Sequence, residues 1–199
     1  MGRHKATLPL SGGDTFLSRI VQTFHDAGVD DVVVVVGHDA EHILAALSDS
    51  PVCARVRFVP NPDYELGQFS SLVKGLNIVD RPGVVGALLT LVDVPLVSAA
   101  TIRAVVERYW QTRVPIVRPT RQSPVSSPLA TGDRRLTTEH GHPVFIDRSL
   151  FDEIRRANAS QGAKRGIRAH ASPAGDIPID DDGAFLDIDT PEQYERVIG

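Results

Sequence analysis

The sequence predicts an α/β domain built around a mostly parallel β-sheet. Segments with helical spacing of apolar residues alternate with short apolar runs, and two of these runs carry no charged residue. The five valines of Val32–Val36 and the run Gly86–Val92 are typical of strands that helices bury on both faces. At 199 residues the chain fits a single domain, 1–199, with a core large enough to fold without disulfides.

Helix limits follow from periodicity and capping residues. The first helix is predicted at Asp14–Ala27, with Asp14 as N-cap and Gly28 as the residue that ends it. Further helices are expected at Asp39–Leu47, Ser70–Val79, Ala99–Arg113, Ser149–Ala157 and from Pro191 onward. Further strands are expected at Arg55–Val59, Pro115–Arg118, Val144–Ile146 and in a closing hairpin that turns at Asp182-Gly183 into Ala184–Ile188.

The predicted helix Asp14–Ala27 has no strand before it, although a helix in a parallel sheet normally connects two strands. Met1–Lys5 is polar and Leu8–Leu10 is too short to be that strand. We therefore expect the first strand of the fold to be missing from this chain. An unpaired position in the sheet would favour a homodimer.

One long polar segment interrupts the alternation. Thr120–His140 contains three serines, two prolines and several arginines but almost no large apolar residue. Such a segment inside a compact domain is a lid, a binding loop or disordered chain, and disorder is the simplest interpretation. We expect residues 120–140 to be a mobile insertion.

Composition excludes several classes of protein. A net charge of −4 argues against a nucleic-acid partner, and every apolar run is shorter than the ~20 residues that cross a membrane. The single cysteine, Cys53, excludes a disulfide framework and a thiolate metal cluster, which fits a cytoplasmic location. Small molecules are the expected partners.

Acidic residues follow two of the predicted strands. Asp93 comes directly after Leu88–Val92 and before the rigid Pro95, while Asp187 and Asp189 are two residues apart and would share one face of a strand. Ligands of α/β sheets bind at the carboxyl ends of strands, so these carboxylates are expected to converge there. Converging carboxylates repel each other, and a divalent cation removes that penalty.

Simpler roles stay open for the same residues. Asp93 would also cap the following turn, and Asp189, just before Thr190-Pro191, would cap the last helix. A capping carboxylate uses one oxygen, which leaves its second oxygen for a metal. The neighbouring run Asp180–Asp182 is expected to be a solvated turn.

A glycine–serine segment and one histidine are further candidates. Gly67, Gln68, Ser70 and Ser71 lie at a predicted helix start, where N–H groups and hydroxyls suit a base edge or a phosphate. Such helix starts are common, so the pattern alone is weak. His142 lies in a turn before the next strand and is either a surface residue or a catalyst.

Taken in order, these segments resemble the MobA-like nucleotidyltransferases, in particular the molybdenum cofactor cytidylyltransferase branch. Met1–Lys5 followed by Leu8–Leu10 is similar to the end of the family signature, a glycine-rich loop that runs through Arg-Met-Gly-x-x-Lys. Later motifs keep the family order: Val36-Gly37, Asn61, Gly67–Leu72, Leu91–Pro95, Gly141–Pro143 and Asp187–Pro191. The resemblance covers nearly the whole chain outside residues 120–140.

The resemblance implies a three-layer Rossmann-like nucleotidyltransferase fold with a small antiparallel β element. It implies transfer of a nucleoside monophosphate from a triphosphate, with CTP expected, to a phosphorylated acceptor such as molybdopterin, with release of pyrophosphate. Asp93 and Asp189 would hold Mg²⁺, Lys5 would contact phosphate oxygens, and Lys5 and Asp93 would be the catalytic residues. His142 would face the acceptor, and the nucleotide would contact Lys5, Gly67, Gln68, Ser70 and Ser71.

The chain departs from the family at its start. Family members begin with a strand and a Leu-Ala-Ala-Gly-x-Ser-x-Arg loop that cradles the triphosphate, and this sequence starts after both. Met1 is therefore expected to be an internal methionine of the signature, through truncation or a wrongly chosen start codon. Two alternatives stay open: a catalytically impaired or dead domain that binds a partner, and a metal-dependent glycosyltransferase that uses Asp-x-Asp to hold a nucleotide sugar.

Overall fold

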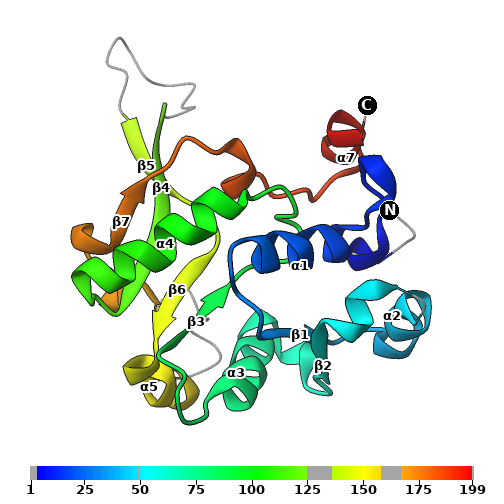
Figure 1. The fold of residues 1–199 in the computed structure, drawn as a ribbon, viewed down its shortest axis with the longest axis horizontal. Helices are drawn as coiled ribbons and strands as arrows, with labels where there is room; N and C mark the ends of the chain where they lie inside the picture. The colour runs from blue at the N-terminus through cyan, green and yellow to red at the C-terminus, as the bar shows by residue number, and fades with distance from the viewer. Residues whose placement is uncertain (1–3, 49, 125–135, 158–166, 199) are drawn as a thin grey trace.

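The computed structural model describes residues 4–48, 50–124, 136–157 and 167–198 (Figure 1). Its helices are α1 Phe16–Asp26, α2 Ala40–Leu47, α3 Gln68–Val79, α4 Ala99–Thr112, α5 Phe151–Arg156 and α7 Pro191–Ile198. Its strands are β1 Val32–Val36, β2 Val56–Pro60, β3 Gly86–Leu89, β4 Ile116–Pro124, β5 Leu136–His140, β6 Val144–Asp147 and β7 Asp176–Pro178. The predicted α/β class is confirmed.

The strands form two sheets. β1 and β2 pair in parallel, and the second sheet has the order β3-β6-β4-β5, with β7 paired to β4. In this second sheet only the β4/β7 pair is parallel, whereas β3/β6, β4/β6 and β4/β5 are antiparallel. The antiparallel share is thus larger than predicted. β5 and β6 follow each other closely in the chain, and both run antiparallel to β4.

Helices cover both faces of the sheets in three layers (Figure 1). Side chains alternate along the strands of the larger sheet: Ile116 and Ile146 pack with α3 and α5, while Val117 and Phe145 pack with α4. In the smaller sheet Val34 and its same-face neighbours pack with α1 and α2. The two-residue periodicity of the strands therefore separates the core into two apolar layers.

β1 and β3 are less buried than predicted. Val32–Val35 and all of β3 are only half-buried, and only Val36 of the valine run is buried. The reason is that, within the described residues, each of these strands has a single hydrogen-bonded neighbour, β2 for β1 and β6 for β3. The strand expected before α1 has no counterpart among the described residues. The homodimer expected from an unpaired sheet position stays a prediction.

The polar segment 120–140 is partly ordered as strand. β4 continues to Pro124, and Thr120–Pro124 pairs with β5 at Leu136–His140. The predicted mobile insertion is therefore too long at both ends. These two strands consist mostly of polar residues, so the sequence lacks the apolar alternation that usually indicates a strand. Residues 125–135 of that segment lie outside the described residues.

The C-terminal part differs most from the prediction. Residues 184–188 form no strand, and Asp182–Ala184 is a 3₁₀ turn rather than a hairpin. β7 instead pairs with β4 over Asp176–Pro178. The alternating pattern of 184–188 arises because the extended chain buries Ala184 and Ile188 against separate parts of the core.

Helix starts also show corrections. Thr15, not Asp14, caps α1, because its hydroxyl accepts a hydrogen bond from Ser18 N–H in a capping box. Gly28 has φ +85°, as expected for the residue that ends this helix. Asp39 precedes α2 as predicted but makes no side-chain cap bond. Asp181, predicted in a solvated turn, accepts hydrogen bonds from Ser98 N–H and the Thr101 hydroxyl at the start of α4.

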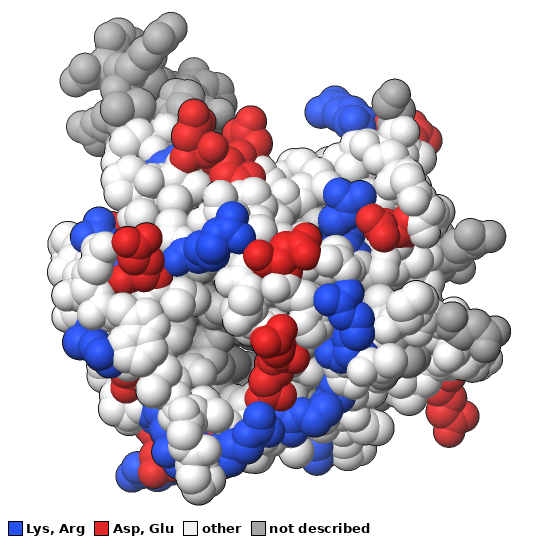
Figure 2. All heavy atoms as spheres, viewed as in Figure 1, with Lys and Arg blue, Asp and Glu red and all other residues white. Residues whose placement is uncertain are grey.

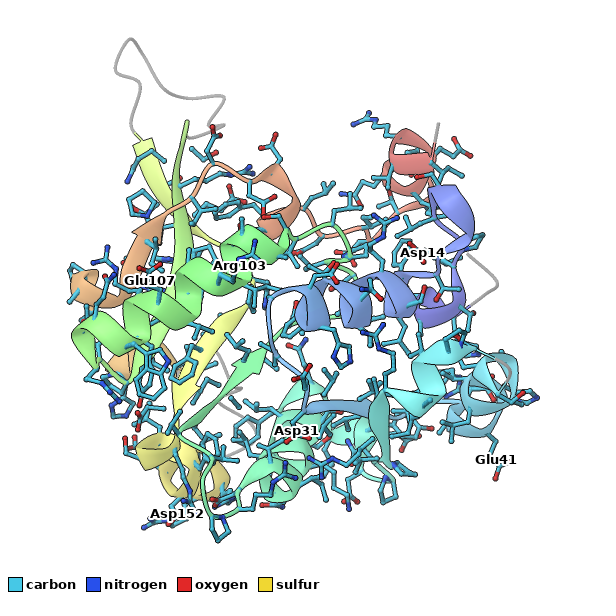
Figure 3. The ribbon with its side chains drawn as sticks, in the orientation of Figure 1. Asp14, Asp31, Glu41, Arg103, Glu107 and Asp152 are labelled. Carbon is cyan, nitrogen blue, oxygen red and sulfur yellow. The ribbon has the colours of Figure 1, made fainter. Side chains whose placement is uncertain are left out.

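Polar contacts at the surface join the layers. Asp31, just before β1, pairs with Arg57 and with Arg81, and Arg103 of α4 donates a hydrogen bond of 2.9 Å to the carbonyl oxygen of Asp26 in α1 (Figure 3). On the face shown in Figure 2, acidic and basic side chains are interspersed. None of the helices in the described part of the chain has the length and apolarity needed to span a membrane.

Candidate active site

Asp93 lies in the turn that follows β3. The strand ends at Leu89, three residues earlier than the predicted limit of Val92, and the chain then turns, with Val94 N–H bonded to the Leu91 carbonyl. The Asp93 side chain is 22% exposed. Its Oδ2 faces Lys5, while its Oδ1 is buried and finds no hydrogen-bond donor among the described residues. A buried carboxylate oxygen without a donor is costly unless a ligand or a cation meets it.

Asp189 approaches from the other end of the chain. The Gln193 side chain accepts hydrogen bonds from the N–H groups of Asp189 and Thr190, and the Thr190 hydroxyl accepts one from Gln193 N–H. This reciprocal pair caps α7, so capping does not occupy the Asp189 carboxylate. The side chain is 60% exposed and its Oδ1 lies 2.5 Å from Lys5 Nζ.

The three predicted residues Lys5, Asp93 and Asp189 come together in the structure. Lys5 Nζ lies 3.4 Å from Asp93 Oδ2 as well as 2.5 Å from Asp189 Oδ1. Ile188 N–H donates to the Asp93 carbonyl oxygen at 2.8 Å, which fixes the two acidic segments beside each other. Partial burial by itself lowers the pKa of the Lys5 ammonium, but the two carboxylates outweigh it and raise the pKa above 10.5. Lys5 is therefore charged at neutral pH.

This arrangement fits a divalent cation that also binds phosphate. Within the described ranges, no group of three or more His, Cys, Asp or Glu side chains could hold a metal by itself. The predicted cluster of three carboxylates, Asp93, Asp187 and Asp189, is therefore not found. Mg²⁺ is typically held by one or two carboxylates together with substrate phosphates and water. The carboxylates of Asp93 and Asp189, which share the Lys5 ammonium, match that requirement, and Asp93 also has a buried oxygen without a donor in the described structure.

The glycine–serine segment is organised by Asn61. Gly67, with φ +90°, ends a 3₁₀ turn, and α3 begins at Gln68. Asn61 is 3% exposed, and its Nδ2 donates to Ser70 Oγ at 2.9 Å and to Ser71 Oγ at 3.0 Å. Asn61 thus holds both hydroxyls at the helix start, and the Ser70 N–H donates to the Gly67 carbonyl oxygen.

His142 lies in a bulge between β5 and β6. Ile116 pairs with Ile146 and Thr120 with His140, so four steps along β4 oppose six along its partner. The extra residues turn the backbone out of the ladder, and His142 N–H bonds to the Ala184 carbonyl at 2.8 Å. His142 Nδ1 is 3.4 Å from the Leu89 carbonyl at the end of β3, four residues before Asp93.

Gly141 is required by this bulge. A Cβ at that position would lie 2.4 Å from the Ala184 carbonyl oxygen, a distance that real side chains do not adopt. The C-terminal segment can therefore pass close to the bulge on its way to Asp189 only because residue 141 has no side chain.

A histidine–aspartate cluster beside Lys5 was not predicted. Asp39, in the left-handed region with φ 57°, accepts a hydrogen bond of 2.6 Å from His4 and contacts His42. His38 lies against both His4 and Tyr64. Hydrogen bonds from His42 lower the pKa of Asp39, and the same contact raises the pKa of His42. The sequence spacing of these residues gives no signal because His4 is 35 residues from Asp39.

A three-layer α/β fold, a lysine that meets two carboxylates and a polar helix start together match the class of nucleotidyltransferases. The model of the MobA-like NTP transferase domain matches residues 1–174, and the chain belongs to this family. The predicted resemblance to the MobA-like family is confirmed. Membership of the molybdenum cofactor branch stays a prediction.

Relatives agree with this assignment. The chain is 26% identical over 201 residues to the purine catabolism protein PucB of Bacillus subtilis, covering 99% of this chain and 89% of that protein. Among solved structures it is similar to Rv0371c of Mycobacterium tuberculosis in complex with manganese, with 25% identity, a TM-score of 0.70, and coverage of 99% and 92%. It shares the fold of 2-C-methyl-D-erythritol 4-phosphate cytidylyltransferase from Thermus thermophilus, with 18% identity, a TM-score of 0.65, and coverage of 97% and 91%.

Proposed function

We propose that this nucleotidyltransferase transfers CMP from CTP to a phosphorylated acceptor, such as molybdopterin, and releases pyrophosphate. The observation that carries the proposal is the convergence of Lys5, Asp93 and Asp189 from three distant parts of the chain. An acceptor phosphate oxygen attacks the α-phosphorus, and the bond to the β-phosphate oxygen breaks. Negative charge on the phosphate oxygens grows most at the bridging oxygen, so positioning and positive charge are the main catalytic requirements.

The residues divide this work by position. Asp93 and Asp189 would hold Mg²⁺ or Mn²⁺, which when bound neutralises phosphate charge. The relative Rv0371c, solved with manganese, supports a divalent ion in this role. Lys5 would bind phosphate oxygens as a compact point charge on a flexible stem. Lys5, which would contact the reacting phosphates, and Asp93, which would act on them through the metal, are the proposed catalytic residues.

Recognition of the base and the acceptor is assigned to two other elements. The nucleotide would contact the start of α3 at Gly67, Gln68, Ser70 and Ser71. Asn61 would orient the hydroxyls of the two serines. His142 would face the acceptor, because its bulge lies beside the Leu89 end of β3. The name of the relative PucB refers to purine catabolism, so a molybdopterin acceptor is the part of the proposal that most needs a direct test.

The test is a panel of the four nucleoside triphosphates with Mg²⁺ or Mn²⁺ and candidate acceptors, read out as pyrophosphate release. We expect release with CTP and a phosphorylated pterin, dependent on metal, and no release without acceptor. Equal release with all four triphosphates would contradict the base assignment. A separate assay that supplies a nucleotide sugar and measures released nucleoside diphosphate tests the glycosyltransferase alternative, which nucleoside diphosphate release would favour. Binding of triphosphate without turnover would favour an impaired domain.

A further inference from the structure

The Lys5 ammonium lies between the two carboxylates that would bind the metal. It is 2.5 Å from Asp189 Oδ1 and 3.4 Å from Asp93 Oδ2, in a place where a divalent ion would have to contact the same two groups. The positive charge of Lys5 offsets part of the repulsion between the two carboxylates. The ammonium and a divalent ion therefore compete for one position.

We infer that Lys5 is the counter-ion of the metal-free site and that it excludes free divalent metal until a triphosphate arrives to accept the ammonium. The inference rests on the proposed function and adds an order of binding: metal and nucleotide enter together. A divalent ion held by Asp93 and Asp189 would be close to the Lys5 ammonium, and like charges at short range repel strongly. A triphosphate supplies oxygens to which the ammonium can move.

The backbone around Lys5 is suited to such an exchange. Lys5–Thr7 forms a 3₁₀ turn closed by hydrogen bonds from Thr7 N–H to the His4 carbonyl and from Leu8 N–H to the Lys5 carbonyl. The preceding residue, His4, is held by Asp39 at 2.6 Å. The main chain is thus anchored, while the side chain is 30% exposed and can rotate about its four-carbon stem.

Asp93 has one oxygen that this exchange would engage. Oδ2 meets Lys5, and the buried Oδ1 has no hydrogen-bond donor in the described part of the chain. The carboxylate is therefore only half-satisfied by the ammonium. A metal with several coordination positions can use the second oxygen directly or through a water, so exchange improves the surroundings of Asp93 once the ammonium has another partner.

The inference predicts opposite effects of one substitution on two ligands. Lys5→Met removes the competing charge, so Mn²⁺ alone should bind at least about tenfold more tightly than to the wild type. The same substitution removes a phosphate contact, so Mn²⁺ with CTP should bind at least about tenfold more weakly. Binding is measured from the electron paramagnetic resonance signal of free Mn²⁺, with and without CTP.

Three variants control this experiment. Lys74→Met removes a lysine from α3, away from the carboxylates, and should change neither affinity. Adding Asp93→Asn to Lys5→Met should abolish the gain for Mn²⁺ alone, which shows that the gain arises at this site. Lys5→Arg keeps the charge and should bind Mn²⁺ alone as weakly as the wild type. Circular dichroism confirms that each variant is folded.

Two outcomes separate the inference from the proposed function. If Lys5→Met binds Mn²⁺ alone no more tightly than the wild type, the exchange is refuted even when the enzyme transfers nucleotides. If Lys5→Met gains affinity for Mn²⁺ but no variant binds any triphosphate with the metal, Lys5 does exclude free metal, and the transferase assignment fails instead.

Discussion

The main-chain N–H of Ile188 donates a hydrogen bond of 2.8 Å to the carbonyl oxygen of Asp93. The Ile188 side chain is fully buried among Leu8, Leu10 and Phe16, so this contact ties the acidic turn after β3 to the core. Neither carboxylate takes part in it. The backbone therefore brings Asp93 and Asp189 together, and charge-removing substitutions at either residue should leave the fold of the site intact.

The first prediction follows from that independence. Asp93→Asn should lower metal-dependent pyrophosphate release by at least about a hundredfold, because it removes a charge next to the reacting phosphates. The midpoint of urea unfolding should stay close to that of the wild type. Steady-state assays at several Mn²⁺ concentrations test this, with the exposed Asp180→Asn as a matched control. Wild-type turnover in Asp93→Asn would remove Asp93 from the mechanism.

The second prediction concerns Asn61. Asn61→Ala leaves Ser70 Oγ and Ser71 Oγ without their shared donor and should cost about 1–3 kcal/mol of unfolding free energy. The KM for the triphosphate should rise as well, because the hydroxyls lose their orientation. Asn77→Ala, the same change at an exposed position of α3, loses a hydrogen bond from Arg155 but should leave the KM unaltered, so it is the control for kinetics. An unaltered KM in Asn61→Ala would show that the serines do not meet the nucleotide.

The third prediction concerns stability in acid. Burial alone would raise the pKa of Asp181, but hydrogen bonds from Thr101, Ser98 and Gly183 outweigh it and hold the pKa below 3.8. The stabilising effect is thus present above pH 3.8 and disappears as the pH falls through the lower folded-state value. Asp181→Asn should lose about 1.5–3 kcal/mol at pH 7 and much less in strong acid.

Urea unfolding at both pH values measures this difference. Asp180→Asn, one residue away and exposed, should lose little at either pH. A loss in Asp181→Asn that is equally large in strong acid would mean that shape rather than charge is responsible.

The fourth prediction concerns His42 and Asp39. Their contact raises the pKa of His42 above 6.5 and lowers that of Asp39 below 3.8. The His42 contribution to stability is complete below pH 6.5 and is lost as the pH rises through the raised value, while the Asp39 contribution is lost as the pH falls below 3.8. The pair therefore stabilises the protein most between these two pH values.

Melting temperatures of the wild type and His42→Ala should differ more at pH 5.5 than at pH 9. The difference should shrink in high salt, because both groups are at the surface. A constant difference across this pH range would contradict the ion-pair interpretation. An NMR titration of the His42 ring tests the raised pKa independently.

The sequence predicts the limits of helices and strands better than it predicts which strands pair with each other. Val32–Val36 forms a strand with the predicted limits, because five β-branched residues in a row leave few other conformations. Its burial was overestimated, since burial depends on how many strands pair with it. Likewise, the apolar alternation of 184–188 indicates which side chains are buried but not that the chain forms a ladder.

Some residues of the candidate site could also be predicted from the sequence, and others could not. Asp93 and Asp189 could be predicted, because positions after apolar runs and the family resemblance both point to them. The position of Lys5 between them could not, since it depends on contacts across 88 and 184 residues. The Asn61 side chain and the Asp39 cluster were missed as organising groups for the same reason: only the folded chain brings their partners within reach.

The 184-residue span between Lys5 and Asp189 also has a consequence for biosynthesis. During translation Lys5 and Asp93 leave the ribosome long before helix α7, so a nascent chain at that stage carries only part of the proposed cation site. Products of premature termination before residue 189 would lack one of the two carboxylates that we propose to bind the metal. The three charged groups therefore meet only late in synthesis, after residue 189 has been added.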